Sequence, residues 1–206
     1  MQDHVMKFEL VKKVPIVAID GKHCFLDTCY PQAIDRVALP IQEYFGIPDL
    51  HVAGMQALKR YAKFDYQNKE IITSDDPILL KGGVEVPIEV RPSGWLVKMA
   101  VGGVEGKYYI DTGAAYSYVH NLSAQFPSAY LADECGWSKG RFKAPMRNVP
   151  CELMGQSFNI LCGDRNDNPE YVPPEGVIGY DFFNNFTIVV DRVGKKMRFV
   201  KRLENN

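Results

Sequence analysis

Residues 107–114 read Lys-Tyr-Tyr-Ile-Asp-Thr-Gly-Ala, so that Asp111 and the Thr-Gly-Ala after it directly follow a strand-like apolar run. An imperfect copy lies earlier in the chain, where Phe25-Leu26 leads into Asp27-Thr28-Cys29. Two carboxylates in matching contexts indicate two related half-domains that face each other. Such an arrangement allows two acids to share one proton, which is a chemistry suited to hydrolysis.

A second pair of blocks comes later, in the same order in both parts of the chain. Val177-Ile-Gly179 is followed by Phe182-Phe183 and the strand-like run 187–190, and the earlier counterpart is Val52-Ala-Gly54, followed by residues 57–72. Each copy is typical of a strand, a glycine turn, a short helix and a β-hairpin. Two blocks in the same order and with similar spacing predict an internal duplication.

We therefore predict an all-β fold of two lobes related by pseudo-two-fold symmetry, with few and short helices. Residues 1–72 would form a shortened N-terminal lobe, residues 73–83 a linker, and residues 84–206 the C-terminal lobe. The C-terminal copy is longer between its two blocks, where residues 123–140 are expected to be loop-like and a β-hairpin is expected at Pro150–Cys162. Helices are expected near three segments, residues 32–45, 57–63 and 182–186.

Composition excludes several classes of protein. The chain has 206 residues, 46% of them hydrophobic and 24% charged, with a formal net charge of −1. The charges are interspersed, so neither a nucleic-acid surface nor a membrane surface is indicated. No apolar run approaches the roughly 20 residues that a spanning helix needs. The N-terminus has no apolar signal core, so we expect a cytoplasmic protein, or a periplasmic or secreted one if a signal peptide was removed.

Five cysteines leave two interpretations open for one pair of them. Cys151 and Cys162 flank the expected hairpin, where cross-strand neighbours could form a disulfide in an oxidising compartment. The favoured interpretation is that both are buried thiols. The sequence has no C-x-x-C pair and no cluster of histidines, so we expect no metal and no cofactor.

Each residue of the Asp-Thr-Gly-Ala run suits a site with two carboxyl groups. One carboxylate would draw a proton from water while the other, protonated, polarises a carbonyl. Thr112 could reach the backbone of the other copy. Gly113 would let the chain pass tightly and offer its N–H to a carboxylate, and Ala114 would keep the site narrow.

On these motifs the C-terminal part, residues 84–199, resembles a lobe of a retropepsin-like aspartic protease. Asp111-Thr-Gly-Ala matches the catalytic loop of that family, and Val177-Ile178-Gly179 matches its apolar-apolar-Gly strand. Residues 8–72 look like a shortened lobe of the same kind, with Gly54 in the place of Gly179. The opening strands resemble those of bacterial members, many of which are exported.

The resemblance implies an aspartic endopeptidase in which Asp27 and Asp111 form the catalytic pair and activate a water. Thr28 and Thr112 would bridge the lobes, and the substrate would be a peptide bound in extended conformation as an added strand. Position 29 departs from the family, since Cys29-Tyr30 stands where Gly-Ala is expected. A flap over the cleft would come from the C-terminal lobe, at the tip of the expected hairpin: Leu153, Met154, Gly155, Gln156, Ser157 and Phe158.

Two other functions remain open at the level of sequence. The departure at Cys29 could mark a peptide-binding protein that has kept the cleft and lost the chemistry. Alternatively, two chains could pair their Asp111 residues in a homodimer, although a monomer is expected. Cys29 could also be a nucleophile, but none of the four histidines has a spacing that points to it, so a small buried thiol is the favoured interpretation.

Overall fold

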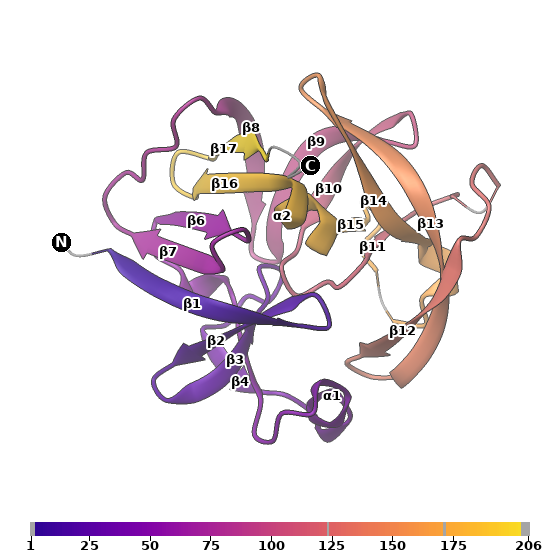
Figure 1. Cartoon of the computed structure of the whole chain (residues 1–206), viewed down its shortest axis with the longest axis horizontal. Coiled ribbons are helices and arrows are strands. Elements are labelled where there is room, and N and C mark those ends of the chain that lie inside the picture. Colours follow the sequence, from indigo (N-terminus) through magenta and orange to yellow (C-terminus); the bar gives the residue numbers. More distant parts are fainter. Residues whose placement is uncertain (1–2, 123, 171, 203–206) are drawn as a thin grey trace.

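The computed structural model describes residues 3–122, 124–170 and 172–202, and most of them lie in strands (Figure 1). Two short α-helices and two 3₁₀ turns interrupt the strands in this described part. The helical elements are α1 (Leu39–Phe45), η1 (Met55–Ala57), η2 (Arg165–Asp167) and α2 (Tyr180–Asn185). The strands are β1 (His4–Val11), β2 (Val14–Ile19), β3 (Lys22–Leu26), β4 (Ile34–Arg36), β5 (His51–Ala53), β6 (Tyr61–Asp65), β7 (Glu70–Ser74), β8 (Val84–Arg91), β9 (Gly94–Val101), β10 (Val104–Ile110), β11 (Ser117–Val119), β12 (Tyr130–Gly136), β13 (Gly140–Leu153), β14 (Gln156–Asp164), β15 (Val177–Ile178), β16 (Phe186–Asp191) and β17 (Lys196–Lys201).

An antiparallel sheet joins the N-terminal and C-terminal parts of the chain. Its strand order is β1-β7-β6-β16-β17-β8, and β6 meets β16 in the middle, with Phe64 opposite Ile188. Along β17 the buried Met197 and Phe199 alternate with the exposed Lys196 and Arg198, because successive side chains point to opposite faces. The buried face of this sheet contributes to the main hydrophobic core.

Each part of the chain has a parallel strand pair that ends at its Asp-Thr loop. Leu26 at the end of β3 pairs with Ala53 of β5, and Ile110 at the end of β10 pairs with Ile178 of β15. The first block of the sequence thus lies beside the second block in both copies. This agrees with the predicted order of the blocks, while the two-fold rotation between the copies stays a prediction.

The two parts differ beyond the Asp-Thr loop. In the C-terminal part the strands β11 to β14 form an extension in which β13 is hydrogen-bonded to both β12 and β14. In the N-terminal part only the short β4 and helix α1 stand between β3 and β5. The helix has a proline in its first turn and ends at Gly46, whose φ of +69° suits glycine.

Several sequence predictions need correction at this level. The helix expected at residues 32–45 is confined to α1, because residues 34–36 form β4. The helix expected at 57–63 is only the 3₁₀ turn η1, after which β6 begins at Tyr61. The helix expected at 182–186 begins earlier, at Tyr180. Within the expected linker, residues 73 and 74 belong to β7.

The possible disulfide is also contradicted. The hairpin between β13 and β14 turns at Met154-Gly155, which places Cys151 opposite Phe158 and Cys162 opposite Arg147. Both cysteines are buried free thiols. Their positions around the turn are therefore out of register for a cross-strand bridge.

No helix among the described residues has the length and apolar character needed to cross a membrane.

Candidate active site

The two Asp-Thr loops meet back to back at the ends of β3 and β10. The Asp27 N–H donates to the carbonyl of Ala53 at 2.9 Å, and the Asp111 N–H donates to the carbonyl of Ile178 at 2.9 Å. Each aspartate is therefore fixed by the neighbouring parallel strand of its own part of the chain. The two loops have the same backbone anchor at the same position.

The threonines tie the two loops to each other. Thr28 Oγ1 donates to the carbonyl of Ile110 at 2.8 Å and accepts from the Thr112 N–H at 3.1 Å. Thr112 Oγ1 donates to the carbonyl of Leu26 at 2.7 Å and accepts from the Thr28 N–H at 3.1 Å. Both side chains are buried, so these four hydrogen bonds replace water that cannot reach the groups. The contacts agree with the bridging role expected for both threonines.

Position 113 requires glycine for reasons of space. The Gly113 N–H donates to Asp111 Oδ1 at 2.8 Å. A Cβ added here would lie 2.8 Å from Cγ and 2.9 Å from Cβ of Asp27. The φ of Gly113 is not positive, so its backbone conformation alone would allow another residue. The close approach of the opposite aspartate is what excludes a side chain.

Position 29 makes the same backbone contact and carries a side chain. The Cys29 N–H donates to Asp27 Oδ1 at 2.8 Å, as Gly113 does to its own aspartate. The φ of Cys29 is not positive either. Its thiol lies against Gly94, where an added Cβ would come within 3.0 Å of the sulfur. Cysteine is therefore accommodated at this position without a twist of the Asp27 loop.

Gly54 and Gly179 both lie where another part of their own lobe passes closely. A Cβ on Gly54 would lie 2.1 Å from the carbonyl oxygen of Tyr30, and one on Gly179 would lie 2.3 Å from that of Ala114. The next residues bind the same loops, since the Met55 N–H donates to Tyr30 and the Tyr180 N–H donates to Ala114, both at 2.9 Å. These glycines therefore support the two Asp loops from beneath.

Carboxyl oxygens of Asp27 and Asp111 lie within 4.8 Å of each other, and this proximity changes the titration of both groups. Burial raises the pKa of Asp27 well above its usual range, and the charge of Asp111 raises this pKa further. Burial also raises the pKa of Asp111, although the Gly113 N–H and the hydrogen bond from Asp27 oppose the rise. Two acids in contact cannot both ionise cheaply, so the pair holds one proton over a range of pH.

The Cys29 thiol faces this pair. Burial raises the pKa of Cys29 well above that of a free thiol, and the charges of Asp111 and Asp27 raise it further. A thiol that resists ionisation is a poor nucleophile, which agrees with the buried-thiol interpretation. Asp27, Cys29 and Asp111 each offer one ligand atom, and these atoms lie within 4.8 Å of one another, so this group could hold a metal ion. Local sequence motifs do not reveal the group, because its members are far apart in the chain.

A cavity of about 180 Å³ opens above the pair. Asp27, Asp111, Gly113 and Ala114 form part of its lining, and aromatic side chains from both parts of the chain form much of the rest. Phe25, Tyr44 and Phe45 come from the N-terminal part, and Tyr116, Tyr118, Trp137 and Phe142 come from the C-terminal part. The cavity therefore lies between the two parts and gives access to both carboxyl groups.

The residues expected to form a flap lie away from the cavity lining. None of the residues 153–158 lines the cavity. Leu153 and Phe158 are buried, and the Phe158 ring packs edge-on against Phe182 of α2 and Phe186 of β16. The hairpin β12–β13 lines the cavity instead, through residues 134–137 and 142. The expected loop at residues 123–140 is wrong in its second half, which forms β12.

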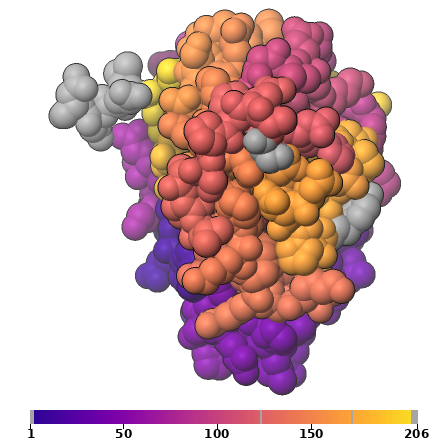
Figure 2. Space-filling model, turned by 90° about the vertical axis from the view of Figure 1, so that its right-hand side faces the viewer, coloured from indigo at the N-terminus to yellow at the C-terminus, as the bar shows by residue number. Residues whose placement is uncertain are grey.

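The tip of the β12–β13 hairpin reaches the N-terminal part of the chain. Trp137 stacks on Tyr30, with ring centroids 5.8 Å apart and an angle of 10°, and its ring centroid also lies 5.8 Å from that of Phe25. The Tyr44 hydroxyl of α1 donates to the carbonyl of Asp133 at 2.8 Å. Figure 1 shows β12 beside α1, and Figure 2 shows the orange surface of this hairpin against the purple surface of the N-terminal part.

One carboxylate holds the turn of this hairpin from the other side. Glu170 accepts from the N–H and the hydroxyl of Ser138, both at 2.9 Å, and from the N–H of Lys139 at 2.5 Å. Gly136 makes room for this contact, because an added Cβ would lie 2.0 Å from Cγ of Glu170. These contacts hold the turn of the hairpin, and with it the wall that it contributes to the cavity, in a defined position.

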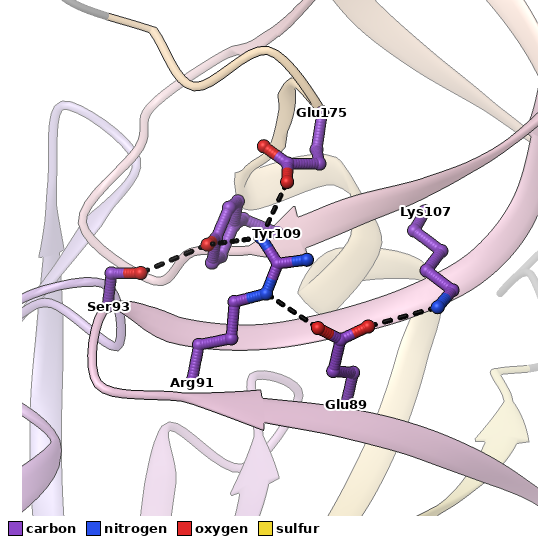
Figure 3. A network of polar contacts seen from close by, with 6 residues as sticks. All are labelled: Glu89, Arg91, Ser93, Lys107, Tyr109 and Glu175. Atoms are coloured by element: carbon purple, nitrogen blue, oxygen red, sulfur yellow. Dashed lines mark hydrogen bonds and ion pairs between the residues drawn. The ribbon is translucent and has the colours of Figure 1, made fainter.

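A polar network connects β8 and the β8–β9 turn to β10 (Figure 3). Arg91 donates to Glu89 at 2.6 Å, to Glu175 at 2.5 Å and to the Tyr109 hydroxyl at 3.3 Å. Ser93 shares a 3.0 Å hydrogen bond with the same hydroxyl. The network thus ties the β8–β9 turn, which contacts Cys29 through Gly94, to the strand that ends at Asp111.

Comparison with solved structures identifies the architecture. An aspartic proteinase from Irpex lacteus superposes with a TM-score of 0.59 at 9% sequence identity, covering 97% of each chain. The chain has an acid protease fold. A retropepsin-like aspartic protease from Rickettsia conorii matches with a TM-score of 0.41 at 16% identity, over 57% of this chain and 89% of that one.

No protein-family model and no curated protein matches the sequence. At this level of identity the likeness shows the fold alone. The acid protease fold confirms the all-β class predicted from the sequence and the resemblance to retropepsin-like proteases at the level of structure. The roles of individual residues depend on the geometry of the carboxyl pair and its cavity.

Proposed function

We propose that the protein is an aspartic endopeptidase that hydrolyses peptide bonds with a water activated by Asp27 and Asp111. The observation that carries the proposal is that carboxyl oxygens of Asp27 and Asp111 lie within 4.8 Å of each other, in one cavity of a single chain. Both groups have raised pKa values, and each accepts one backbone N–H from its own loop. A pair of this kind holds one proton, so it can supply both an acid and a base.

The two carboxyl groups would have different roles. We assign the shared proton to Asp27, whose pKa is raised by burial and, in addition, by the charge of Asp111. Asp111 would then be the base that takes a proton from water, and Asp27 would donate a hydrogen bond to the carbonyl oxygen of the substrate. After attack, the proton on Asp111 would pass to the leaving amine.

The cavity fits a peptide as substrate. Its aromatic lining suits side chains of an extended peptide, and the β12–β13 hairpin closes over the carboxyl pair. For a peptide to enter, the contact between Trp137 and Tyr30 must open. Closure afterwards would exclude bulk water from the reaction.

One alternative keeps the cleft without the chemistry. The Cys29 sulfur lies within 4.8 Å of carboxylate oxygens of Asp27 and Asp111, at a position that could hinder the attacking water. This contact favours a catalytically silent peptide-binding protein as the second candidate. The homodimer has less support, since Asp111 already has Asp27 as its partner within the chain.

The proposal is tested by a cleavage survey with peptide libraries between about pH 3 and pH 8. Wild type should cleave, and Asp111→Asn should reduce the rate by about 10²- to 10⁴-fold, the usual contribution of a general base. Asp20→Asn is a matched control, because Asp20 lies in a turn away from the cavity with φ +50°, which asparagine also adopts. Cleavage should persist in EDTA.

Equal cleavage by wild type and Asp111→Asn would exclude the proposed chemistry. Peptide binding by wild type without cleavage at any pH would favour the silent binding protein. Loss of cleavage in EDTA would move the chemistry to a metal held by the Asp27–Cys29–Asp111 group.

A further inference from the structure

A third acid lines the cavity that contains the Asp27–Asp111 pair. Glu134 lies on β12, in the hairpin that covers the cavity, and its side chain is mostly buried. The Tyr118 hydroxyl donates to Glu134 Oε2 at 2.6 Å. This hydrogen bond fixes the carboxyl group but brings no positive charge to it.

The surroundings of Glu134 are apolar and aromatic. Tyr116, Phe142, Val172 and Val177 line the same cavity, and these side chains pack together around Tyr118. A pocket with apolar walls and a carboxyl group inside it suits a long side chain that has a positively charged end. The apolar stem of lysine or arginine can lie along such walls while its charge meets a carboxylate.

Lys13 is the cation that acts on the Glu134 carboxyl group, but its ammonium group contacts other side chains. Lys13 Nζ lies over the ring of Tyr116, 4.1 Å from its centroid, and 5.4 Å from that of Tyr180. Its charge is shared with Asp181, which acts on Lys13 more strongly than Glu134 does. Among the described residues no cation forms an ion pair with Glu134.

Glu170 is the other glutamate in the cavity lining, and both of its carboxylate oxygens already accept hydrogen bonds from Ser138 and Lys139. Of the two glutamates that line the cavity, Glu134 is therefore the one whose carboxyl group is available to pair with a cation from a bound peptide. Burial raises the pKa of Glu134 to about 7, against the opposing effects of Tyr118 and Lys13. A bound cation would remove the cost of ionising this buried group.

We propose that Glu134 and the aromatic walls around it form a subsite that selects a basic side chain, lysine or arginine, of the bound peptide. The inference rests on the proposed function only in placing a peptide in this cavity. The ring faces of Tyr116 and Phe142 would contact the stem, and the carboxylate would bind the charged end. Glu134 is then a residue that sets specificity and does not take part in proton transfer.

The test measures peptide binding separately from catalysis. Asp111→Asn serves as the binding form, with fluorescent octapeptides of neutral sequence in which one lysine is moved through every position. Matched peptides carry norleucine or glutamate at the same place. At pH 8, where Glu134 is largely ionised, one position should favour lysine over norleucine by roughly tenfold to hundredfold.

Adding Glu134→Gln should abolish this preference while leaving norleucine binding unchanged. Glutamine is nearly isosteric and can still accept from Tyr118, so the pocket keeps its shape. Asp133→Asn is the matched control. It removes one negative charge from the same strand, but Asp133 has a side chain 74% exposed and paired with Lys143. The preference should survive this control.

Two results would overturn the subsite: equal binding of lysine and norleucine peptides at every position, or a lysine preference that persists in Glu134→Gln. Cleavage of the same peptides by wild type separates this inference from the proposed function. Cleavage without a basic preference leaves the peptidase standing and removes the subsite. A lysine preference that depends on Glu134, without any cleavage, supports the subsite and contradicts the peptidase.

Discussion

The Asp27 loop and the Asp111 loop have the same hydrogen bonds and differ in the space around them. In both, a backbone N–H two residues after the aspartate donates to its carboxylate at 2.8 Å. At Gly113 a Cβ would collide with Asp27, whereas at position 29 the side chain of Cys29 has a place against Gly94. The comparison shows that glycine is required here by the neighbouring loop and not by its own backbone conformation.

The presence of Cys29 in only one of the loops also makes the pKa values of the two carboxyl groups differ. The Cys29 thiol lies beside Asp111 and helps to hold the pKa of Asp111 down, whereas burial and the charge of Asp111 both raise the pKa of Asp27. An asymmetric pair has a preferred site for its shared proton. The departure from the family motif at Cys29 is therefore compatible with catalysis and biases which aspartate is the base.

Among substitutions that leave both carboxyl groups in place, the largest loss of rate is expected from Gly113→Ala. The added methyl group would lie less than 3 Å from two carbon atoms of Asp27, so one loop must move. A displacement of about 1 Å at reacting groups can cost roughly 100-fold in rate. We expect kcat/KM to fall by about that factor, measured with the best peptide of the cleavage survey. Unchanged kinetics would show that the two loops are less close than these distances require.

The threonine pair should give the next largest effect. Thr28→Val and Thr112→Val each remove two buried hydrogen bonds and leave a backbone N–H and a carbonyl of the other loop without a partner. The expected loss is about 2–5 kcal/mol in the free energy of unfolding for either variant. Thermal and urea unfolding would measure it. A large loss in one variant and none in the other would contradict the equivalence of the two loops.

Asp27→Asn should raise stability at neutral pH. A carboxyl group with a raised pKa in the folded state binds more protons there than in the unfolded chain. Wild type is therefore destabilised as pH rises above the unfolded value of about 3.9 and through the folded pKa. The difference in Tm between Asp27→Asn and wild type should be positive at pH 7 and should shrink below about pH 4. A difference that grows towards acid pH would reverse the sign of the shift.

The smallest effect is expected from Cys29→Gly. The fold should persist with a loss of up to ~1 kcal/mol, the entropic cost of glycine. Since the thiol helps to hold the pKa of Asp111 down, its loss should move the acid limb of the pH–rate profile upward with kcat little changed. Loss of cleavage with the fold retained would instead make the thiol essential to the chemistry.

The sequence was sufficient to place the two Asp loops and the glycines beneath them, because short motifs repeated in the same order. It failed at β12. The run Tyr130–Gly136 mixes exposed and buried side chains without strict alternation, so its pattern does not distinguish a strand from a loop. A usable signal was present, since Gly136 and Gly140 bound a three-residue turn and pair with each other.

Asp181 shows a contact that local patterns do not reveal. It lies in the first turn of α2, whose N-cap is Gly179, and its carboxylate accepts from the Leu161 N–H at 2.6 Å. A partner on a distant strand is invisible to local patterns. The metal-capable group and the Glu134 pocket were missed in the same way, because their members meet only in the folded chain.

The central claim is that Asp27 and Asp111 of one chain act as a pair in peptide hydrolysis. The most direct measurement is the cleavage rate of Asp27→Asn beside Asp111→Asn, each purified alone and checked for folding. We predict that both lose about 10²- to 10⁴-fold, and that mixing them restores nothing. Cleavage at the wild-type rate by Asp27→Asn, with loss only in Asp111→Asn, would contradict the claim and favour a dimer that pairs Asp111 from two chains.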